Sequence, residues 1–318
     1  KDIETLDTLN QLKIDLQGDV SSPLGFIAGG MHVGLRRKKK DFGWIYSTTA
    51  AAAAGTYTLN RFKAAPLKVT EETIKNNQSL QAIVVNSANA NSCTGEKGIQ
   101  DAKDTQAWVA EHLNLSKESV GVASTGVIGS FLPMDKIQHG TQNVLKEQYN
   151  QSEFFNQAIL TTDTFTKHLS VQVEIDGITV TIGGTAKGSG MIHPNMATML
   201  SFITSDVNIK RELLDDILQE SIQTTYNMVS VDGDTSTNDT VVVLANGMAG
   251  NTEITEKNAD YEAFKKALHF INTKLAKDLV RDGEGATKFI EVNVIGAKTV
   301  QDAKKMAKSV ITSNVVKT

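Results

Sequence analysis

The sequence predicts a mixed α/β (α+β) fold, because strand-like and helix-like apolar patterns are interleaved along the whole chain. At least one pair of strands has the pattern of an antiparallel hairpin, which argues against a purely parallel sheet. The 318 residues are 40% hydrophobic and 21% charged, enough apolar material for a sizeable core. Together these observations favour layers of sheet and helix.

The first half of the chain repeats one theme, a short apolar run followed by a polar loop and a helical pattern. Residues 82–85 form a β-branched run typical of a buried strand, and 99–113 carry apolar residues at helical spacing. A second strand is expected at 120–123, with a helix that begins near Pro133. The basic run at 36–40 is interpreted as a solvated loop.

The clearest local signal is the hairpin over residues 169–182. Apolar and polar residues alternate on both sides of Asp176 and Gly177, a pair that favours a two-residue hairpin turn. Beyond it the pattern predicts, in order, a strand at 198–206, a helix at 213–222, a strand at 241–244, a helix at 264–279, a strand at 290–294 and a helix at 300–311.

Composition and charge narrow the class of protein. The net charge of -4 argues against a nucleic-acid-binding function, and no apolar run reaches the length of a membrane span. The chain contains a single cysteine, Cys93, so a disulfide framework and a cysteine-rich zinc site are excluded. We therefore expect a cytoplasmic protein that binds neither nucleic acid nor membrane.

Three common catalytic patterns fit poorly. In the glycine-rich stretch at 183–190 the lysine precedes the glycine, the reverse of the order that a phosphate loop requires. Asp232, Asp234 and Asp239 lie close in sequence but lack the glutamate of a calcium loop, and the histidines have no metal-ligand spacing, so no metal is expected. No serine elbow is present, and Cys93 is interpreted as structural.

What remains is a set of loops rich in Thr, Ser, Gly and Asn. They occupy residues 86–95, 124–129, 161–164, 187–198, 232–240 and 282–285. Such loops expose backbone N–H groups and hydroxyls, which suits a site that binds a small polar molecule and stabilises developing negative charge. The pattern alone does not identify a nucleophile, because hydroxyls in loops more commonly cap turns.

The stretch "KGSGMIHPNMATML" at 187–200 resembles the self-cleavage signature of the ornithine acetyltransferase family, the glutamate N-acetyltransferases of the cyclic arginine pathway. Further blocks of that family follow the same order: "AAAAAGTYTLNRFKAAP", "NSANANSCTG", "STGVIG", "TTDT" and "DGEGATKF". The resemblance implies a layered αββα sandwich of the N-terminal-nucleophile-like type with a second, smaller α/β domain. Residues 1–197 and 198–282 would form the α-chain and β-chain parts of the sandwich, and 283–318 would begin the smaller domain, which this sequence leaves incomplete.

The resemblance also implies that the chain cuts its own backbone between Ala197 and Thr198. Thr198 would then become the N-terminus of a second fragment. A free α-amino group titrates near 7.7–8.0, so it can serve as general base for the hydroxyl of the same residue. No separate histidine is then needed.

The implied reaction moves the acetyl group of N-acetylornithine to glutamate through an acetyl-Thr198 intermediate. By resemblance Thr125 and Gly126 form the oxyanion hole. The substrate contacts would be Thr161, Lys187, Thr198 and Glu284. We expect Lys187 to meet a substrate carboxylate, or to lower the pKa of the nearby amine, and Glu284 to meet the ornithine amine. No cofactor is expected, and whether acetyl-CoA also serves as donor is left open.

Family members assemble as heterotetramers of two α and two β fragments, and we expect the same here. Two alternatives stay open at this point. The first is an aminopeptidase or amidase of the same fold that uses Thr198 to activate attack by water. The second is an uncleaved, inactive amino-acid-binding homologue.

Overall fold

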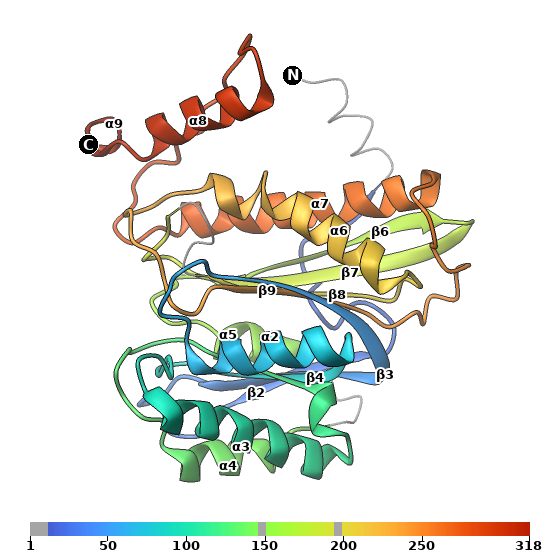
Figure 1. The fold of residues 1–318 in the computed structure, drawn as a ribbon, viewed down its shortest axis with the longest axis vertical. Coiled ribbons are helices and arrows are strands. Elements are labelled where there is room, and N and C mark those ends of the chain that lie inside the picture. The colour runs from blue at the N-terminus through green and yellow to red at the C-terminus, as the bar shows by residue number, and fades with distance from the viewer. Residues whose placement is uncertain (1–11, 146–150, 194–198) are drawn as a thin grey trace.

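The computed structural model describes residues 12–145, 151–193 and 199–318, which form a nine-stranded sheet covered by helices (Figure 1). The strand order is β1-β6-β7-β8-β9-β3-β4-β5, and β2 pairs with β3 outside this path. The strands are β1 (Lys13–Asp15), β2 (Phe26–Met31), β3 (Phe42–Tyr57), β4 (Ser79–Asn86), β5 (Val120–Ser124), β6 (Lys167–Ile175), β7 (Ile178–Lys187), β8 (Leu200–Ser205) and β9 (Thr240–Ala245).

The long strand β3 folds this sheet into two halves. Its first part pairs with β2 and β4, its last part pairs with β9, and the register shifts between Tyr46 and Ala51. An irregularity of this kind bends a strand and increases its local twist. Apolar side chains from both halves, among them Ile45 and Phe202, meet in one buried cluster between them.

Helices cover the two outer faces of the folded sheet. In Figure 1, α6 and α7 lie over β6 to β9, and α3 and α4 lie on the opposite side of β2 and β4. The predicted layered αββα sandwich is therefore confirmed. The helices are α2 (Ala65–Asn77), α3 (Gly95–Leu113), α4 (Met134–Thr141), α5 (Ser152–Ala158), α6 (Arg211–Ile222), α7 (Ala259–Arg281), α8 (Val300–Ile311) and α9 (Asn314–Lys317), with 3₁₀ turns at Lys117–Ser119 and Tyr226–Met228.

The predicted hairpin is confirmed as β6 and β7, which pair in antiparallel register around Asp176 and Gly177. Both turn residues have positive φ, 52° and 71°, as a primed hairpin turn requires. The expected strands at 82–85, 120–123 and 241–244 are present as β4, β5 and β9. The expected helices are present as α3, α4, α6, α7 and α8.

The strand predicted at 290–294 is wrong. Residues 286–295 have no regular secondary structure, and Ile290 is 42% exposed. An alternating pattern becomes a strand only where a neighbouring strand completes its hydrogen bonds, and no strand of the described chain pairs with this segment. Residues 283–318 therefore contribute α8 and α9 here, and their assignment to a smaller domain stays a prediction.

Across the described ranges, no helix combines the length and the apolar character that a bilayer span needs.

Candidate active site

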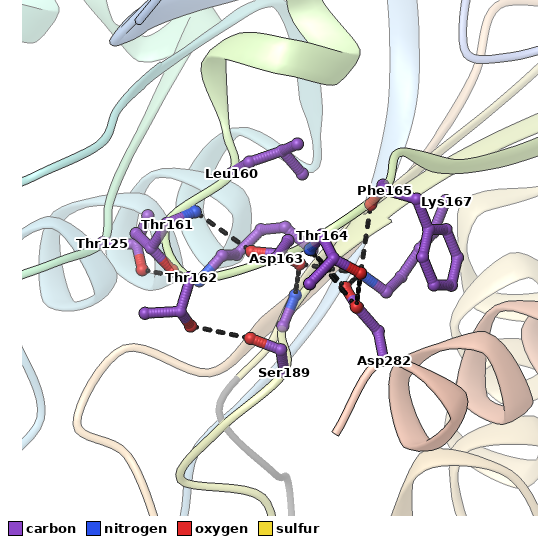
Figure 2. A network of polar contacts seen from close by, with 12 residues as sticks. Thr125, Leu160, Thr161, Thr162, Asp163, Thr164, Phe165, Lys167, Ser189 and Asp282 are labelled. Atoms are coloured by element: carbon purple, nitrogen blue, oxygen red, sulfur yellow. Dashed lines mark hydrogen bonds and ion pairs between the residues drawn. The ribbon is translucent and has the colours of Figure 1, made fainter. Parts of the chain in front are cut away.

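The polar loops predicted from the sequence meet at one edge of the folded sheet. Hydrogen bonds join the described parts of all of them across large sequence separations, and Figure 2 shows those that link the loops at 124–129, 161–164, 187–193 and 282–285. Asn238 Nδ2, for example, donates to the carbonyls of Ala90 (2.7 Å) and Ser124 (2.8 Å), which links the loops at 86–95, 124–129 and 232–240. A hydroxyl-rich polar site is therefore assembled from segments that the sequence keeps apart.

Lys187 lies at the end of β7 and joins two of the predicted site residues. Its ammonium donates to Thr161 Oγ1 at 2.7 Å and to Thr125 Oγ1 at 3.2 Å. The side chain is only 3% exposed, and burial lowers its pKa; Asp163 opposes this shift and Lys167 adds to it. Since the Thr125 hydroxyl accepts from Lys187, its own proton is free to be donated elsewhere.

Gly126 follows Thr125 where the chain leaves β5. Its φ is +133°, and a Cβ built there would lie 2.2 Å from the carbonyl carbon of Ala88 and 2.5 Å from Asn89 N. Only glycine fits such a close backbone approach. The Thr125 amide donates to Asn86 O at 3.0 Å, which anchors this turn to the end of β4.

Asp163 organises the loop between α5 and β6. Its Oδ1 accepts from Lys167 Nζ (2.8 Å) and from the Gly188 amide (2.6 Å), and its Oδ2 accepts from the Thr161 amide (3.0 Å). Burial raises the pKa of this carboxyl, but Lys187 and Lys167 outweigh it and hold the pKa at about 2. Asp163 is therefore an anion at neutral pH.

The turn after α7 carries Glu284 to the same site. Asp282 accepts from Lys167 Nζ at 2.5 Å and from the Thr164 amide at 3.0 Å. The Glu284 amide donates to Ser189 O at 2.8 Å, and the Ser189 hydroxyl is 2.7 Å from that of Thr162. Glu284 itself is exposed, so its carboxylate is open to a ligand at the edge of the site.

Ala197 and Thr198, the predicted cleavage site and nucleophile, lie outside the described residues. Met199 directly follows them, and its amide donates to Oδ1 of Asp239 at 3.1 Å. Asp239 is fully buried, and its Oδ2 has no hydrogen-bond partner among the described residues. Burial raises its pKa well above the usual range for a carboxyl, although the Met199 amide opposes this shift.

Sequence reasoning missed two cations that shape the site. Arg36 belongs to the basic run interpreted as solvated, yet its guanidinium donates to the carbonyls of Leu160 (2.7 Å) and Thr161 (2.8 Å). Lys167 is completely buried, and it continues the alternation of the inward-facing Leu169 and Val171. A lysine in phase with core positions was the signal that could have identified it.

The described chain contains no group of His, Cys, Asp and Glu side chains arranged to hold a metal ion. Asp232 instead accepts from the Ile192 amide at 2.9 Å and from the Asp234 amide at 3.2 Å. The Asp232 carboxylate therefore hydrogen-bonds backbone amides within and beside its own turn.

The αββα layers carry a hydroxyl-rich polar site of the kind that stabilises developing negative charge. The model of the ArgJ family matches residues 27–318, and the chain belongs to this family. The arginine biosynthesis bifunctional protein ArgJ of Staphylococcus saprophyticus is 69% identical over 318 residues, which are 100% of this chain and 77% of that protein. Its counterpart in Staphylococcus aureus is 56% identical over 315 residues, 99% and 76% of the two chains.

Two solved structures are similar over part of the chain. The arginine biosynthesis bifunctional protein ArgJ of Bacillus halodurans has a TM-score of 0.56 at 50% identity. It covers 58% of this chain and 99% of its own. Ornithine acetyltransferase of Mycobacterium tuberculosis, complexed with ornithine, has a TM-score of 0.52 at 31% identity and covers 57% and 98%.

Proposed function

We propose that this enzyme transfers the acetyl group of N-acetylornithine to glutamate in arginine biosynthesis, after cutting its own backbone at Ala197–Thr198. Family membership and the names of the relatives support the overall reaction. The observation that supports the mechanism is the convergence of Thr125 and Thr161 on Lys187, which pairs with Leu200 at the start of β8.

Self-cleavage is supported by the length of the solved relatives. Nearly all of the Bacillus halodurans chain aligns, 99%, yet it covers only 58% of this chain. A chain of that size is what scission near Thr198 would produce, because residues before Thr198 make up a similar share of this sequence. Within the cleaved enzyme, the Thr198 amine becomes the general base for its own hydroxyl.

The first half-reaction forms an acetyl ester on Thr198. The Thr198 amine takes the hydroxyl proton while Oγ1 attacks the acetyl carbonyl. The oxyanion accepts hydrogen bonds from the Thr125 hydroxyl and the Gly126 N–H. The amide C–N bond then breaks, and the amine of ornithine leaves with the proton held by Thr198. Thr125 can donate because its lone pair already accepts from Lys187.

The second half-reaction reverses these roles. The amine of glutamate attacks the acetyl ester, its surplus proton passes to the Thr198 amine, and N-acetylglutamate leaves as the Thr198 hydroxyl is restored. Lys187 meets the substrate carboxylate, and Glu284 meets the side-chain ammonium of ornithine. Burial of Lys187 strengthens the first contact because little water competes for its charge.

The assembly proposed is a cytoplasmic heterotetramer of two α and two β fragments that needs no cofactor. The relatives' description as bifunctional supports acetyl-CoA as a second acetyl donor for glutamate. Glutamate acetylation with acetyl-CoA as the sole donor measures this directly.

The decisive experiment replaces Thr198 with alanine. We expect the variant to run as a single band on a denaturing gel and to form no N-acetylglutamate from N-acetylornithine and glutamate. Thr179→Ala, an exposed threonine on β7, serves as the matched control and should behave as wild type. Cleavage and transfer that persist in Thr198→Ala would exclude the mechanism, and release of acetate without N-acetylglutamate in the wild type would indicate a hydrolase.

A further inference from the structure

Lys167 lies between two carboxylates, Asp163 and Asp282. Their hydrogen bonds lead to Lys187 and Glu284, the groups proposed to bind the two ends of ornithine. The Lys167 ammonium lies 2.8 Å from Asp163 Oδ1 and 2.5 Å from Asp282 Oδ2, and all three side chains are at most 1% exposed. Figure 2 shows Lys167 between these two carboxylates. Breaking either contact would leave an uncompensated charge in the interior, so the bridge has one favourable geometry.

On one side, the contact of Lys167 with Asp163 leads to Lys187. The oxygen of Asp163 that accepts from Lys167 also accepts from the amide of Gly188, the residue next to Lys187, at 2.6 Å. Its other oxygen accepts from the amide of Thr161, whose hydroxyl in turn accepts from Lys187. The Lys187 ammonium is therefore fixed relative to Asp163 from two sides.

On the other side, the contact of Lys167 with Asp282 leads to Glu284. Asp282 accepts from both the amide and the hydroxyl of Thr164, which ties the end of α7 to the loop of Asp163. Two residues later, the Glu284 amide bonds Ser189 O, and the carboxylate lies so close to Gly190 that a Cβ there would be 2.6 Å from Glu284 Oε1. The position of Glu284 thus depends on the turn that Lys167 and Thr164 hold.

We propose that Lys167 is a positioning residue that sets the spacing between Lys187 and Glu284 and so selects the length of the diamino acid. This inference rests on the proposed function, in which Lys187 binds the carboxylate and Glu284 the ammonium. A fixed spacing favours the three-methylene side chain of ornithine over the four-methylene side chain of lysine. One methylene in a closed site changes kcat/KM by about 10–200-fold.

A purely structural bridge would behave differently. If Lys167 only stabilised the fold, weakening its contact with Asp282 would lower the free energy of unfolding and leave substrate preference unchanged. If it sets the spacing, the same change raises KM for N-acetylornithine and relaxes the preference, while self-cleavage and kcat persist.

The test measures kcat/KM for N-acetylornithine and for Nα-acetyl-lysine with glutamate as acceptor. In Asp282→Asn, which keeps an acceptor for Thr164 but removes the charge, we expect KM for N-acetylornithine to rise about tenfold and the ratio of the two kcat/KM values to fall about tenfold. The matched control is Lys274→Met on α7, which breaks an ion pair with Asp278 outside this network and should keep the wild-type ratio.

Each outcome decides between the alternatives. Wild-type preference in a folded, self-cleaving Asp282→Asn enzyme overturns the proposal. If that variant does not fold, the ratio in Thr164→Val decides instead, because it removes only the hydroxyl that donates to Asp282, on a residue that is itself exposed. A wild type that neither cleaves itself nor uses N-acetylornithine would refute the proposed function itself, which is a separate result.

Discussion

Two buried carboxyl groups near the site, Asp163 and Asp239, have pKa values shifted in opposite directions although both are almost completely enclosed. The Asp163 side chain is 0% exposed and accepts hydrogen bonds from Lys167, Gly188 and Thr161, and its pKa is lowered to about 2. Asp239 is 0% exposed, accepts from the Met199 amide, and burial raises its pKa well above the usual range.

The difference teaches that partners, more than depth of burial, decide the charge of an interior acid. Burial disfavours the anion at both positions. Two ammonium groups compensate at Asp163, whereas Lys187 acts on Asp239 only as a weaker, more distant charge. The Asp163 region is therefore a network of paired ions, whereas burial favours the protonated form of Asp239, which accepts from the Met199 amide.

The largest change in the free energy of unfolding is expected from removing Asp163, the carboxylate at the centre of the ion network. Asp163→Ala leaves Lys167 with a single carboxylate and leaves the amides of Gly188 and Thr161 without their acceptor. Breaking a buried ion pair in this way costs about 3–5 kcal/mol, measurable as a loss in the free energy of unfolding by denaturant titration. Asp104→Ala, which removes an exposed carboxylate on α3, is the control. A loss no larger than the control's would show that the network contributes little.

Asp239→Asn should raise the free energy of unfolding, whereas Asp163→Ala should lower it. Burial disfavours the Asp239 anion and so raises its pKa, a cost at neutral pH that the amide avoids while it still accepts from Met199. The variant should be more stable at pH 7, by at most about 4 kcal/mol, the free energy of protonating an ordinary aspartic acid at that pH. The raised pKa of Asp239 in the folded state lowers the stability of the wild type only at pH values above the unfolded pKa near 4. The gain in the variant should therefore vanish near pH 4. An equally large gain at pH 4 would mean that burial does not raise the pKa of Asp239.

Acid unfolding provides a third comparison. The depressed pKa of Asp163 stabilises the fold at pH values above the unfolded pKa near 4, and this contribution is lost as pH falls through about 2. It amounts to about 2 kcal/mol. The wild type should lose this much more stability between pH 5 and pH 2 than Asp163→Asn does, in unfolding experiments at matched salt. Parallel pH profiles for the two proteins would contradict the assignment of Asp163 as the anion.

Much of the fold could be predicted from the sequence because its signals are local. The hairpin of β6 and β7 follows from a period of two around Asp176 and Gly177, and α8 follows from helical spacing over 300–311. The folding of the sheet at β3 and the parallel pairing of β8 with β9 depend on contacts between distant segments. No local pattern encodes them.

The candidate site, like the fold, could be predicted from the sequence only in part. Its loops were recognisable from composition, and their chemistry came from family resemblance, but the partners were not visible. Lys167 is 115 residues from Asp282, and Arg36 is 125 residues from Thr161. Periodicity could have placed Lys167 in phase with the inward-facing Leu169, but that inference was not drawn from the sequence. Only the folded chain brings that lysine to its carboxylates.

The smallest change in the free energy of unfolding is expected at the ion pair of Lys63 and Glu71, which has the same N–O distance as the pair of Lys167 and Asp163 but lies in contact with solvent. Lys63 Nζ lies 2.8 Å from Glu71 Oε2, the distance that separates Lys167 from Asp163, yet its side chain is 29% exposed and that of Glu71 is 41% exposed. Water and salt screen such a pair, so Glu71→Gln should change the free energy of unfolding by less than about 0.5 kcal/mol, with no change left in 1 M salt. A change of several kcal/mol would show that distance sets the strength of these pairs. A small change, beside a large one for Asp163→Ala, would assign the difference to burial.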